Sequence, residues 1–307
     1  MNRNIKKKKG KVVYSVMNTS YKHIMSYPWY KKVLPDSVVL GLKFKKYMGY
    51  KLDLNNVQTF NEKLQWLKLH DRNPIYSTIV DKYMVKEYMA SIIGEKYIIP
   101  TLGVWKKFEE IKFELLPRQF VLKCTHDSGG LVICDDKEKF NYSNAKKKID
   151  ECLETNFYWI AREWPYKNVI PQIIAEEYIG YYPLDYKFFT FEGEIDSVMV
   201  CKGRELGHPY FYFYDMKWER LYYQHEELEK DDQVDKPENF DEMISIVRKI
   251  AKGYCHLRVD LYNINGKIYF GECTFFDQGG YDTDITYNTD LMWGKKMNLD
   301  EHGRKHR

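Results

Sequence analysis

Two carboxylates stand on either side of a predicted turn in the C-terminal part of the chain. Asp260 and Glu272 each have apolar neighbours in the stretch YCHLRVDLYNINGKIYFGECTF, residues 254–275. Asn265-Gly266 lies between the two β-type runs, and this dipeptide is a strong hairpin signal because both residues tolerate positive φ. Carboxylate oxygens are the ligands that Mg²⁺ prefers, so the pair is a candidate metal site.

The length of the turn decides whether the two acids share a face. A two-residue turn would put Asp260 and Glu272 on opposite faces, whereas a three-residue loop over residues 264–266 would put them on the same face. The apolar residues of the two runs favour the shorter turn, and the metal site requires the longer one. The alternative without a metal is a surface ion pair between Arg258 and Asp260.

The composition is that of a folded protein with one large domain or two. The chain has 307 residues, of which 44% are hydrophobic and 16% aromatic. No run approaches twenty apolar residues, and the basic N-terminal cluster lacks the apolar segment of a signal peptide, so we expect a cytoplasmic protein. The six cysteines form no CxxC pair and have no histidine at zinc-finger spacing, which predicts reduced, buried thiols.

Positive charge is concentrated at the N-terminal end. Residues 1–51 carry 13 Lys and Arg against the single acid Asp36, a net charge of +12, while the remainder carries −8. Residues 29–50 mix lysines with apolar side chains in the manner of a basic amphipathic helix. This helix would either contact an anionic membrane surface, which would place the protein peripherally on the inner face of the plasma membrane, or dock on the body of the protein.

Helix and strand signals divide the chain into a helical part and a sheet part. Thr59 and Glu62 form a capping box that predicts a helix over 60–70, and two more helices are expected from Pro74 and over 81–94, with Lys82 at the start of the last. Later patterns predict helices over 144–160 and 240–252, and strands over 120–123, 131–134, 172–179, 185–191, 195–201, 210–214 and 217–222. Helices followed by mainly antiparallel strands indicate an α+β fold.

A glycine-rich loop connects two of the predicted strands. The residues THDSGG, 125–130, follow Lys123, and their backbone N–H groups are suited to an anion-binding concavity to which Ser128 would add a hydroxyl. The loop is no Walker A motif, and the chain has no GxGxxG. A plain hairpin connection is the alternative interpretation.

The order of these motifs resembles the ATP-grasp superfamily. Lys82 opens a helix, Lys123 precedes the loop HDSGG, the run IAEEYI follows at 174–179, and the two hairpin acids come last. The phrases TFNEKLQWLKLHDRNP, LPRQFVLKCTHDSGG, REWPYKNV, DYKFFTFEGE and RVDLYNINGKIYFGE look like its TupA-like subgroup, over about residues 28–300. The resemblance implies an α+β fold of mainly antiparallel sheets with packed helices, in which ATP lies between two α+β subdomains.

With the charge pattern, this resemblance divides the chain into four parts. They are a basic tail over 1–27, a helical region over 28–95, an ATP-grasp core over 96–300 and a C-terminal tail over 301–307.

The resemblance implies that ATP and Mg²⁺ bind at the quoted motifs. Asp260 and Glu272 would hold Mg²⁺ together, and the resemblance therefore favours the three-residue turn. Arg258 would stabilise the transferring phosphoryl group, and Lys187 would be a further phosphate contact. A structural ion pair of Arg258 with Asp260 is the alternative for that arginine. The other expected nucleotide contacts are Lys82 and Lys123 at the phosphates, His126, Asp127, Ser128, Gly129 and Gly130 over them, Glu176, Glu177, Tyr178 and Ile179 beside adenine, and Asp185 at the ribose.

The implied reaction is ATP-dependent ligation of a carboxylate with an amine or thiol through an acyl phosphate. The setting that the resemblance implies is bacterial cell-surface polysaccharide or teichuronopeptide synthesis. The partners would be a small-molecule or lipid-linked saccharide acceptor and an amino-acid-like substrate, and no nucleic acid is expected. One departure from the superfamily is Thr274, which stands where a metal-ligating Asn commonly follows the hairpin Glu, and this puts a second metal in question.

A short acidic triplet supports an alternative function. Asp282-Thr283-Asp284 has the DxD pattern with which many glycosyltransferases bind Mn²⁺ and a nucleotide sugar. A glycosyltransferase of capsular or surface polysaccharide synthesis is therefore the rival interpretation, and a noncatalytic envelope scaffold with a basic N-terminal helix is a third. The simpler structural explanation of the triplet is a solvated loop after Gly279-Gly280.

Overall fold

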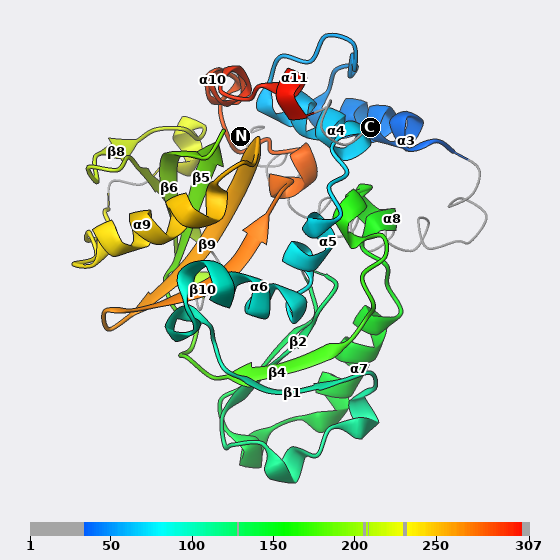
Figure 1. The fold of residues 1–307 in the computed structure, drawn as a ribbon, viewed down its shortest axis with the longest axis vertical. Coiled ribbons are helices and arrows are strands. Elements are labelled where there is room, and N and C mark those ends of the chain that lie inside the picture. Colours follow the sequence, from blue (N-terminus) through cyan, green and yellow to red (C-terminus); the bar gives the residue numbers. More distant parts are fainter. Residues whose placement is uncertain (1–33, 128, 205–206, 208, 230–231, 303–307) are drawn as a thin grey trace, which may run out of the picture.

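Two antiparallel sheets form the framework of the protein. The computed structural model describes residues 34–127, 129–204, 207, 209–229 and 232–302. A smaller sheet has the strand order β1-β4-β2-β3, and a larger one has the order β10-β9-β5-β6-β7-β8. Figure 1 shows the smaller sheet below the larger one, with α6 between them. The fold is α+β with antiparallel sheets, as predicted, while the expected tail over 1–27 lies outside the described residues.

Four α-helices of the described chain precede the first strand. They are α3 (Asp36–Met48), α4 (Phe60–His70), α5 (Ile75–Val80) and α6 (Met84–Ile93). The predicted capping box begins α4: the Thr59 hydroxyl accepts the backbone N–H of Glu62, whose carboxylate accepts the N–H of Thr59 at 3.0 Å. Asp81 accepts two N–H groups at the start of α6, and Lys82 lies in the turn just before this helix.

The predicted amphipathic helix is present as α3 and docks on the protein body. Its buried face consists of Val39, Leu40, Lys43 and Phe44. Leu42, on the outer face, is 61% exposed. Contact of this outer face with a membrane remains a prediction, and residues 29–33 of the predicted helix lie outside the described part. No helix in the described part of the chain is long and apolar enough to cross a membrane.

The smaller sheet has its own hydrophobic core. Its strands are β1 (Thr101–Trp105), β2 (Phe120–Cys124), β3 (Leu131–Cys134) and β4 (Ile173–Glu177). Helix α7 (Tyr142–Leu153) covers this sheet and buries Ala145, Ile149 and Cys152 against it. The single helix predicted over 144–160 is wrong, because the chain leaves α7 after Leu153 and starts the short α8 (Tyr158–Ala161). The Asn156 side chain accepts the backbone N–H of Tyr158 at this break.

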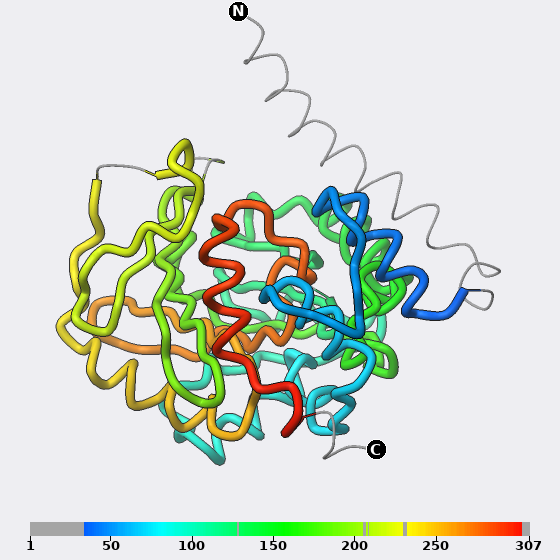
Figure 2. The backbone as a smooth tube through the Cα atoms, turned by 90° about the horizontal axis from the view of Figure 1, so that it is seen from above, coloured from blue at the N-terminus to red at the C-terminus, as the bar shows by residue number. Residues whose placement is uncertain are grey.

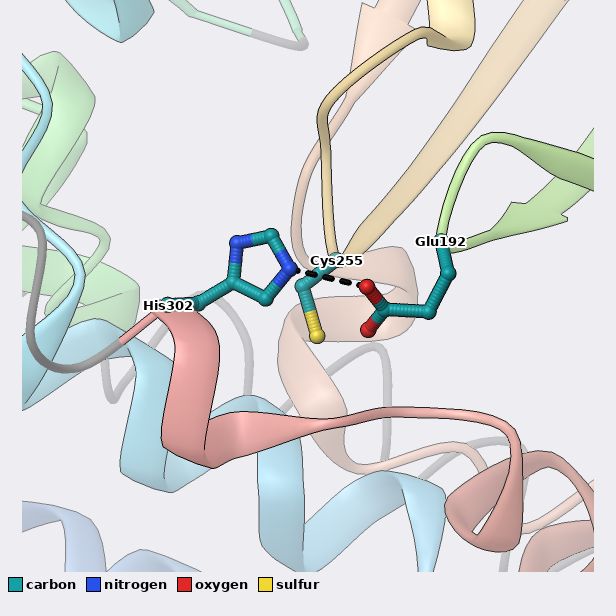
Figure 3. A group of neighbouring side chains, drawn as sticks. All are labelled: Glu192, Cys255 and His302. Atoms are coloured by element: carbon teal, nitrogen blue, oxygen red, sulfur yellow. Dashed lines mark hydrogen bonds and ion pairs between the residues drawn. The ribbon is translucent and has the colours of Figure 1, made fainter.

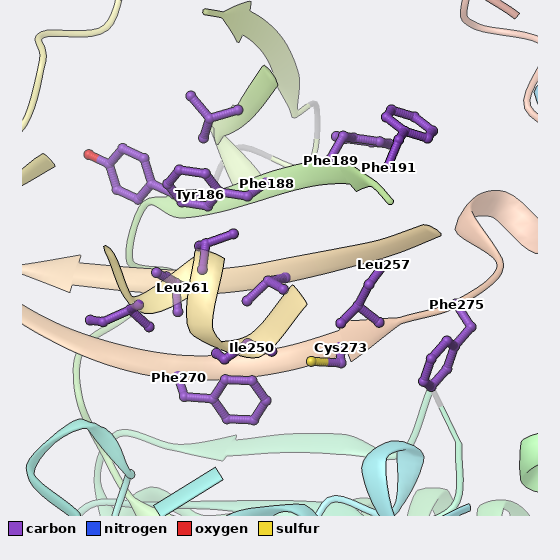
Figure 4. Packing of buried hydrophobic residues seen from close by; sticks show 14 of the residues in the cluster. Tyr186, Phe188, Phe189, Phe191, Ile250, Leu257, Leu261, Phe270, Cys273 and Phe275 are labelled. Atoms are coloured by element: carbon purple, nitrogen blue, oxygen red, sulfur yellow. The ribbon is translucent and has the colours of Figure 1, made fainter. Parts of the chain in front are cut away.

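The larger sheet carries the main core. Its strands are β5 (Asp185–Phe191), β6 (Glu194–Lys202), β7 (Tyr210–Tyr214), β8 (Arg220–Leu221), β9 (His256–Ile264) and β10 (Lys267–Thr274). Alternate residues of β5 and β9, among them Phe188 and Leu261, point into the core beneath α9 (Phe240–Ala251), as Figure 4 shows. The opposite face of these strands carries charged side chains. Strand β8 is shorter than the predicted run over 217–222.

The hairpin of β9 and β10 combines a short turn with a bulge. Ile264 pairs with Lys267 across a two-residue turn in which Asn265 and Gly266 both have positive φ. The expectation that the acids could share a face only across a three-residue loop is therefore wrong. Between Phe270 and Glu272 the register shifts by one residue, so Glu272 pairs with Asp260. An extra residue in one strand of an antiparallel pair reverses the alternation beyond it.

The C-terminal helices close the fold over the N-terminal ones. Figure 2 shows α10 (Tyr287–Lys295) running beside α4, and the Asp290 carboxylate accepts the backbone N–H of Asn61 at 2.8 Å. Further along, His302 at the end of α11 (Leu299–His302) lies 3.0 Å from the Glu192 carboxylate, next to the buried Cys255 (Figure 3). Because the same carboxylate also accepts the N–H of Asn298, this cluster joins the C-terminal segment to the β5–β6 turn.

Candidate active site

A cavity, here called the inter-sheet cavity, lies between the two sheets. Asp185 and Lys187 of β5, Tyr262 of β9 and Glu272 of β10 face it from the larger sheet. Cross-strand partners share a face, so the pairing of Lys187 with Asp260 and of Asp185 with Tyr262 puts all these side chains on the side opposite the core. The smaller sheet, its loop and α6 supply the remaining walls.

The buried Glu176 and two half-buried lysines form an ion-pair triad in the wall of the inter-sheet cavity. Its carboxylate lies 2.6 Å from the Lys123 ammonium and 2.5 Å from that of Lys86. Burial raises the pKa of Glu176, but the attraction of Lys123 and Lys86 outweighs it and lowers the pKa below its usual value. The Glu176 carboxylate is therefore held as an anion between the two lysine side chains. Lys86 was missed in the sequence, although it lies four residues after Lys82.

The glycine loop between β2 and β3 reaches the inter-sheet cavity through Asp127, Gly129 and Gly130. Asp127 accepts the Gly130 N–H at 3.1 Å and the Cys152 thiol at 2.6 Å, which fixes the loop on α7. Lys82 donates to the Asp127 carbonyl and lines the same cavity. The predicted residue Ser128 lies outside the described residues.

His126 is turned away from the inter-sheet cavity. Its side chain is buried, and Nε2 lies 3.1 and 3.0 Å from the carbonyl oxygens of Cys152 and Thr155. In the described structure the histidine therefore satisfies carbonyl groups after α7 and does not line the cavity.

A more apolar pocket adjoins the inter-sheet cavity, with Lys123, Glu176, Asp185 and Tyr262 in both linings. Glu177 and Ile179, at the end of β4, line this apolar pocket, whereas Tyr178 does not. The rest of its wall consists mainly of apolar and ring side chains, namely Ile99, Val121, Leu131, Ile133, Tyr182 and Pro183.

A chain of ion pairs runs along the site face of the larger sheet. Asp185 accepts from Lys187 at 2.6 Å and from Arg204 at 3.2 Å, and Lys187 also pairs with Asp260. Arg258 binds both oxygens of Asp260, at 2.7 and 2.8 Å. Burial raises the pKa of Asp260, but Arg258 and Lys187 outweigh it and lower the pKa. Asp260 is therefore held as an anion under the inter-sheet cavity.

The two hairpin acids meet at one guanidinium group. Arg258 Nη2 lies 2.8 Å from an Asp260 oxygen and 3.3 Å from a Glu272 oxygen. The Glu272 side chain is 44% exposed, and that of Asp260 is 2% exposed. Two carboxylates that contact the same nitrogen atom provide hard oxygen ligands, which are the ligands that fit a magnesium ion. Arg258 occupies the same place, and a bound ion would replace part of its contact with Asp260.

A third cavity, here called the helix-side cavity, begins at Glu272. Arg258 and Thr274 of the hairpin line it, together with Asp277, which binds Arg258. Its aromatic walls are Tyr47, Phe157, Tyr166, Phe276 and Tyr281. Asp277 and Tyr281 stand in the loop that follows the hairpin, and the sequence showed no pattern that marks Asp277 as a partner of Arg258.

The DxD triplet forms a local turn. One oxygen of Asp282 accepts the backbone N–H of Asp284 at 2.9 Å, and Asn61 of α4 holds the Asp282 backbone at 2.8 and 3.1 Å. Burial and the nearby Asp277 raise the pKa of Asp282 to about 7. A carboxyl group that is partly protonated at neutral pH is a poor metal ligand, because a proton competes with the ion.

Among solved structures, the chain is similar to a D-alanine–D-alanine ligase from Bacillus anthracis complexed with ATP, with 17% identity and a TM-score of 0.43 over 73% of this chain and 67% of that chain. It is also similar to an L-amino acid ligase from Bacillus licheniformis, with 12% identity and a TM-score of 0.43 over 80% of this chain and 56% of that chain. A third similar structure is an N5-carboxyaminoimidazole synthetase from Staphylococcus aureus complexed with ADP, with 13% identity and a TM-score of 0.42 over 80% of this chain and 61% of that chain.

No curated protein matches the chain. The model of one protein family, described as TupA-like ATP-grasp, matches residues 62–298, which include both sheets, the glycine loop and the hairpin acids. This match spans most of the 307 residues. The chain therefore belongs to the TupA-like ATP-grasp family.

Proposed function

We propose that the protein is an ATP- and Mg²⁺-dependent ligase that activates a carboxylate as an acyl phosphate and joins it to an amine. The observation that carries the proposal is the meeting of two cavities at Glu272. The inter-sheet cavity has the charges for a triphosphate, and the helix-side cavity offers a separate space for the group that receives the phosphoryl. Ligation by this route requires both ligands on opposite sides of one reaction centre.

The nucleotide fits the inter-sheet cavity and the adjoining apolar pocket. Five cationic side chains line the inter-sheet cavity: Lys82, Lys86, Lys123, Lys187 and Arg204. They suit the negative charge of a triphosphate, because phosphoryl transfer depends mainly on positioning and on neutralisation of charge. The apolar pocket suits a purine base, with Glu177 and Ile179 at its edge and Asp185 between base and phosphates.

Asp260 and Glu272 are the residues that would hold Mg²⁺. Their direct pairing across the hairpin and their common contact with Arg258 support this assignment. When bound, the ion would neutralise phosphate oxygens and keep them in its coordination shell.

Arg258 and Lys187 are proposed to stabilise the transferring phosphoryl group. Both are buried, and both are held by carboxylates on the site face of the larger sheet. Ion pairs fix the positions of these two cations before a substrate binds, and preorganised charge of this kind lowers the barrier without reorganisation at the moment of reaction.

The biological setting is proposed from the family. The carboxylate or its acceptor would belong to a cell-surface polysaccharide or teichuronopeptide, small or lipid-linked, and the amine would come from an amino-acid-like substrate. A cytoplasmic location with peripheral membrane contact through residues 1–51 would bring such an enzyme to lipid-linked precursors.

The test is nucleotide turnover with defined probes. The purified full chain is incubated with ATP, Mg²⁺ and hydroxylamine, and with glucuronic or galacturonic acid as the carboxylate. We expect ADP release that requires the uronic acid and a matching yield of hydroxamate, because hydroxylamine captures an acyl phosphate. Consumption of a UDP-sugar without ATP would contradict the ligase assignment and support a glycosyltransferase.

A further inference from the structure

Glu192, Cys255 and His302 bring three different kinds of metal ligand together, in what is here called the C-terminal cluster. A carboxylate oxygen, the thiol sulfur and a ring nitrogen all lie within 4.8 Å of one another. The three side chains converge from the β5–β6 turn, from the residue before β9 and from the end of α11, as Figure 3 shows. None of them lines the inter-sheet cavity, the apolar pocket or the helix-side cavity. The C-terminal cluster is therefore separate from the proposed active site.

Backbone contacts fix the positions of the donor atoms. The N–H of Glu192 donates to the Cys255 carbonyl at 3.0 Å, which holds the two segments side by side. The N–H of Asn298 binds one carboxylate oxygen of Glu192 at 2.8 Å, and the other oxygen lies 3.0 Å from Nε2 of His302. Cys255 and His302 are 2% and 6% exposed, whereas the Glu192 side chain is 33% exposed. The C-terminal cluster is thus buried at the thiol and the imidazole and open to solvent at the carboxylate.

The mixture of sulfur, nitrogen and oxygen donors selects the kind of ion. Zn²⁺ binds all three donor types and prefers a tetrahedral arrangement. Mg²⁺ and Ca²⁺ prefer oxygen ligands. Two ligand atoms that each lie about 2.1 Å from a tetrahedral zinc ion are roughly 3.4 Å apart. The 3.0 Å between the Glu192 oxygen and the His302 nitrogen is close to this spacing, so these two side chains need to move little.

The charges of the C-terminal cluster also suit a divalent cation. A thiolate at Cys255 and the carboxylate of Glu192 together balance the two positive charges of Zn²⁺, so the bound ion would add no net charge to a largely buried site. Lys63 is close enough for its charge to act on both residues. Its ammonium group, however, donates to the Met297 carbonyl at 2.8 Å. This lysine is therefore anchored beside the cluster by a different acceptor.

We propose that Glu192, Cys255 and His302 bind one structural Zn²⁺ ion, with water as the fourth ligand on the exposed side of Glu192. When the ion binds, the thiol of Cys255 gives its proton to solvent and the thiolate sulfur coordinates the metal. The ion also takes the place of the direct contact between Glu192 and His302. It would hold α11 on the β5–β6 turn and on the start of β9. This inference does not depend on the proposed ligase function.

The family match does not include the whole of this site. His302 lies after residues 62–298, the part of the chain that the family model matches. The three ligands are also far apart in the sequence, so no short spacing of cysteine and histidine indicates them. Only the folded chain brings them together.

The experiment measures zinc binding by the full chain. The purified protein is treated with EDTA, freed of the chelator and titrated with Zn²⁺ in excess Mg²⁺. Retained metal is then measured by plasma mass spectrometry after gel filtration. We expect one zinc ion per chain and a higher midpoint of thermal unfolding, because the ion binds the folded state. Co²⁺ in place of Zn²⁺ should produce the near-ultraviolet absorption of a thiolate–cobalt bond.

Variants assign the bound ion to the C-terminal cluster. Cys255→Ser and His302→Gln should each raise the half-saturating zinc concentration at least about tenfold. The matched controls are another buried cysteine and an exposed histidine outside the cluster, and Cys134→Ser and His225→Gln should change this concentration less than twofold. Glu272→Gln should also bind zinc like the wild type, which separates the site from the proposed magnesium ligands.

Four results would overturn the inference. They are no retained zinc in the wild type, an unchanged unfolding midpoint with zinc, no thiolate–cobalt absorption, and unaltered zinc binding by Cys255→Ser. The first three concern the wild type alone, so they remain decisive if a substitution prevents folding.

Discussion

Asp260 and Glu272 lie directly opposite each other across β9 and β10, although the turn that joins these strands has only two residues. Gly271 is the extra residue that makes this possible. A Cβ atom at position 271 would lie 3.0 Å from the Asp260 carbonyl oxygen and 3.2 Å from the Tyr262 ring. The bulge therefore depends on a residue without a side chain, and the proposed metal site depends on the bulge.

We predict that Gly271→Ala lowers ATP turnover on the order of 10- to 100-fold, because displacement of β10 moves Glu272 away from Asp260. The measurement is ADP release at saturating ATP. The matched control is Gly266→Ala in the turn, where the φ of 79° strains an alanine and no atom lies within 4 Å. It should cost about 1 kcal/mol of unfolding free energy and leave turnover unchanged. Full activity of Gly271→Ala would refute the role of the bulge.

Glu272→Gln should reduce ADP release at least about 100-fold while leaving the unfolding free energy nearly unchanged, since its side chain is 44% exposed. Asp260→Asn should also abolish turnover. It should in addition destabilise the fold by about 3 kcal/mol, because Arg258 and Lys187 then lose a buried partner. Urea denaturation separates the two effects.

Asp282→Asn tests the rival function in the same assay. We expect this variant to retain measurable ATP turnover, because Asp282 holds a local turn outside the nucleotide cavity. If Asp282→Asn were inactive while Glu272→Gln kept its activity, the glycosyltransferase would be favoured over the ligase.

Glu176→Gln should destabilise the nucleotide-free protein by about 3 kcal/mol, because the half-buried Lys86 and Lys123 would lose their shared, buried carboxylate. ATP with Mg²⁺ should recover part of this loss, since phosphate oxygens can pair with the same lysines. The measurement is urea denaturation with and without nucleotide. The exposed Glu227→Gln, which lies outside the nucleotide cavities, is the control, and equal nucleotide effects in both variants would argue against phosphate binding at the triad.

The buried His256 should make the protein less stable in mild acid. Burial lowers its pKa to about 3, while Nδ1–H donates to the Thr190 carbonyl. Between pH 6.5 and 3 the unfolded chain therefore binds the proton that the folded chain refuses, so stability falls as the pH falls. From pH 6.5 to 5 this one residue should cost about 2 kcal/mol. His256→Asn, measured by urea denaturation, should show a pH dependence that is smaller by that amount.

Deletion of residues 1–27 should reduce binding to liposomes that contain anionic lipids, because most of the net charge of +12 in residues 1–51 would be removed. ATP binding should not change. Co-sedimentation with vesicles, at low and physiological salt, is the measurement. Equal sedimentation of the full and shortened chains would reject the membrane contact.

Local signals in the sequence were sufficient for most elements. The capping box at Thr59 and Glu62 predicted the start of α4, and Asn265-Gly266 predicted the hairpin, because both patterns depend on contacts within a few residues. The order of motifs was also enough to identify the ATP-grasp family, which the match over residues 62–298 shows.

Relationships between distant segments could be decided only by the tertiary structure. No pattern in the sequence shows that Lys86 shares Glu176 with Lys123, that Asp277 reaches Arg258, or that Lys43 and Glu163 line one cavity. The pairing of the hairpin acids is also decided by the tertiary structure. Regular alternation correctly predicts that a short turn puts Asp260 and Glu272 on opposite faces. The bulge that reverses this depends on packing of Gly271 against Asp260 and Tyr262 of the neighbouring strand. This packing exists only in the folded sheet.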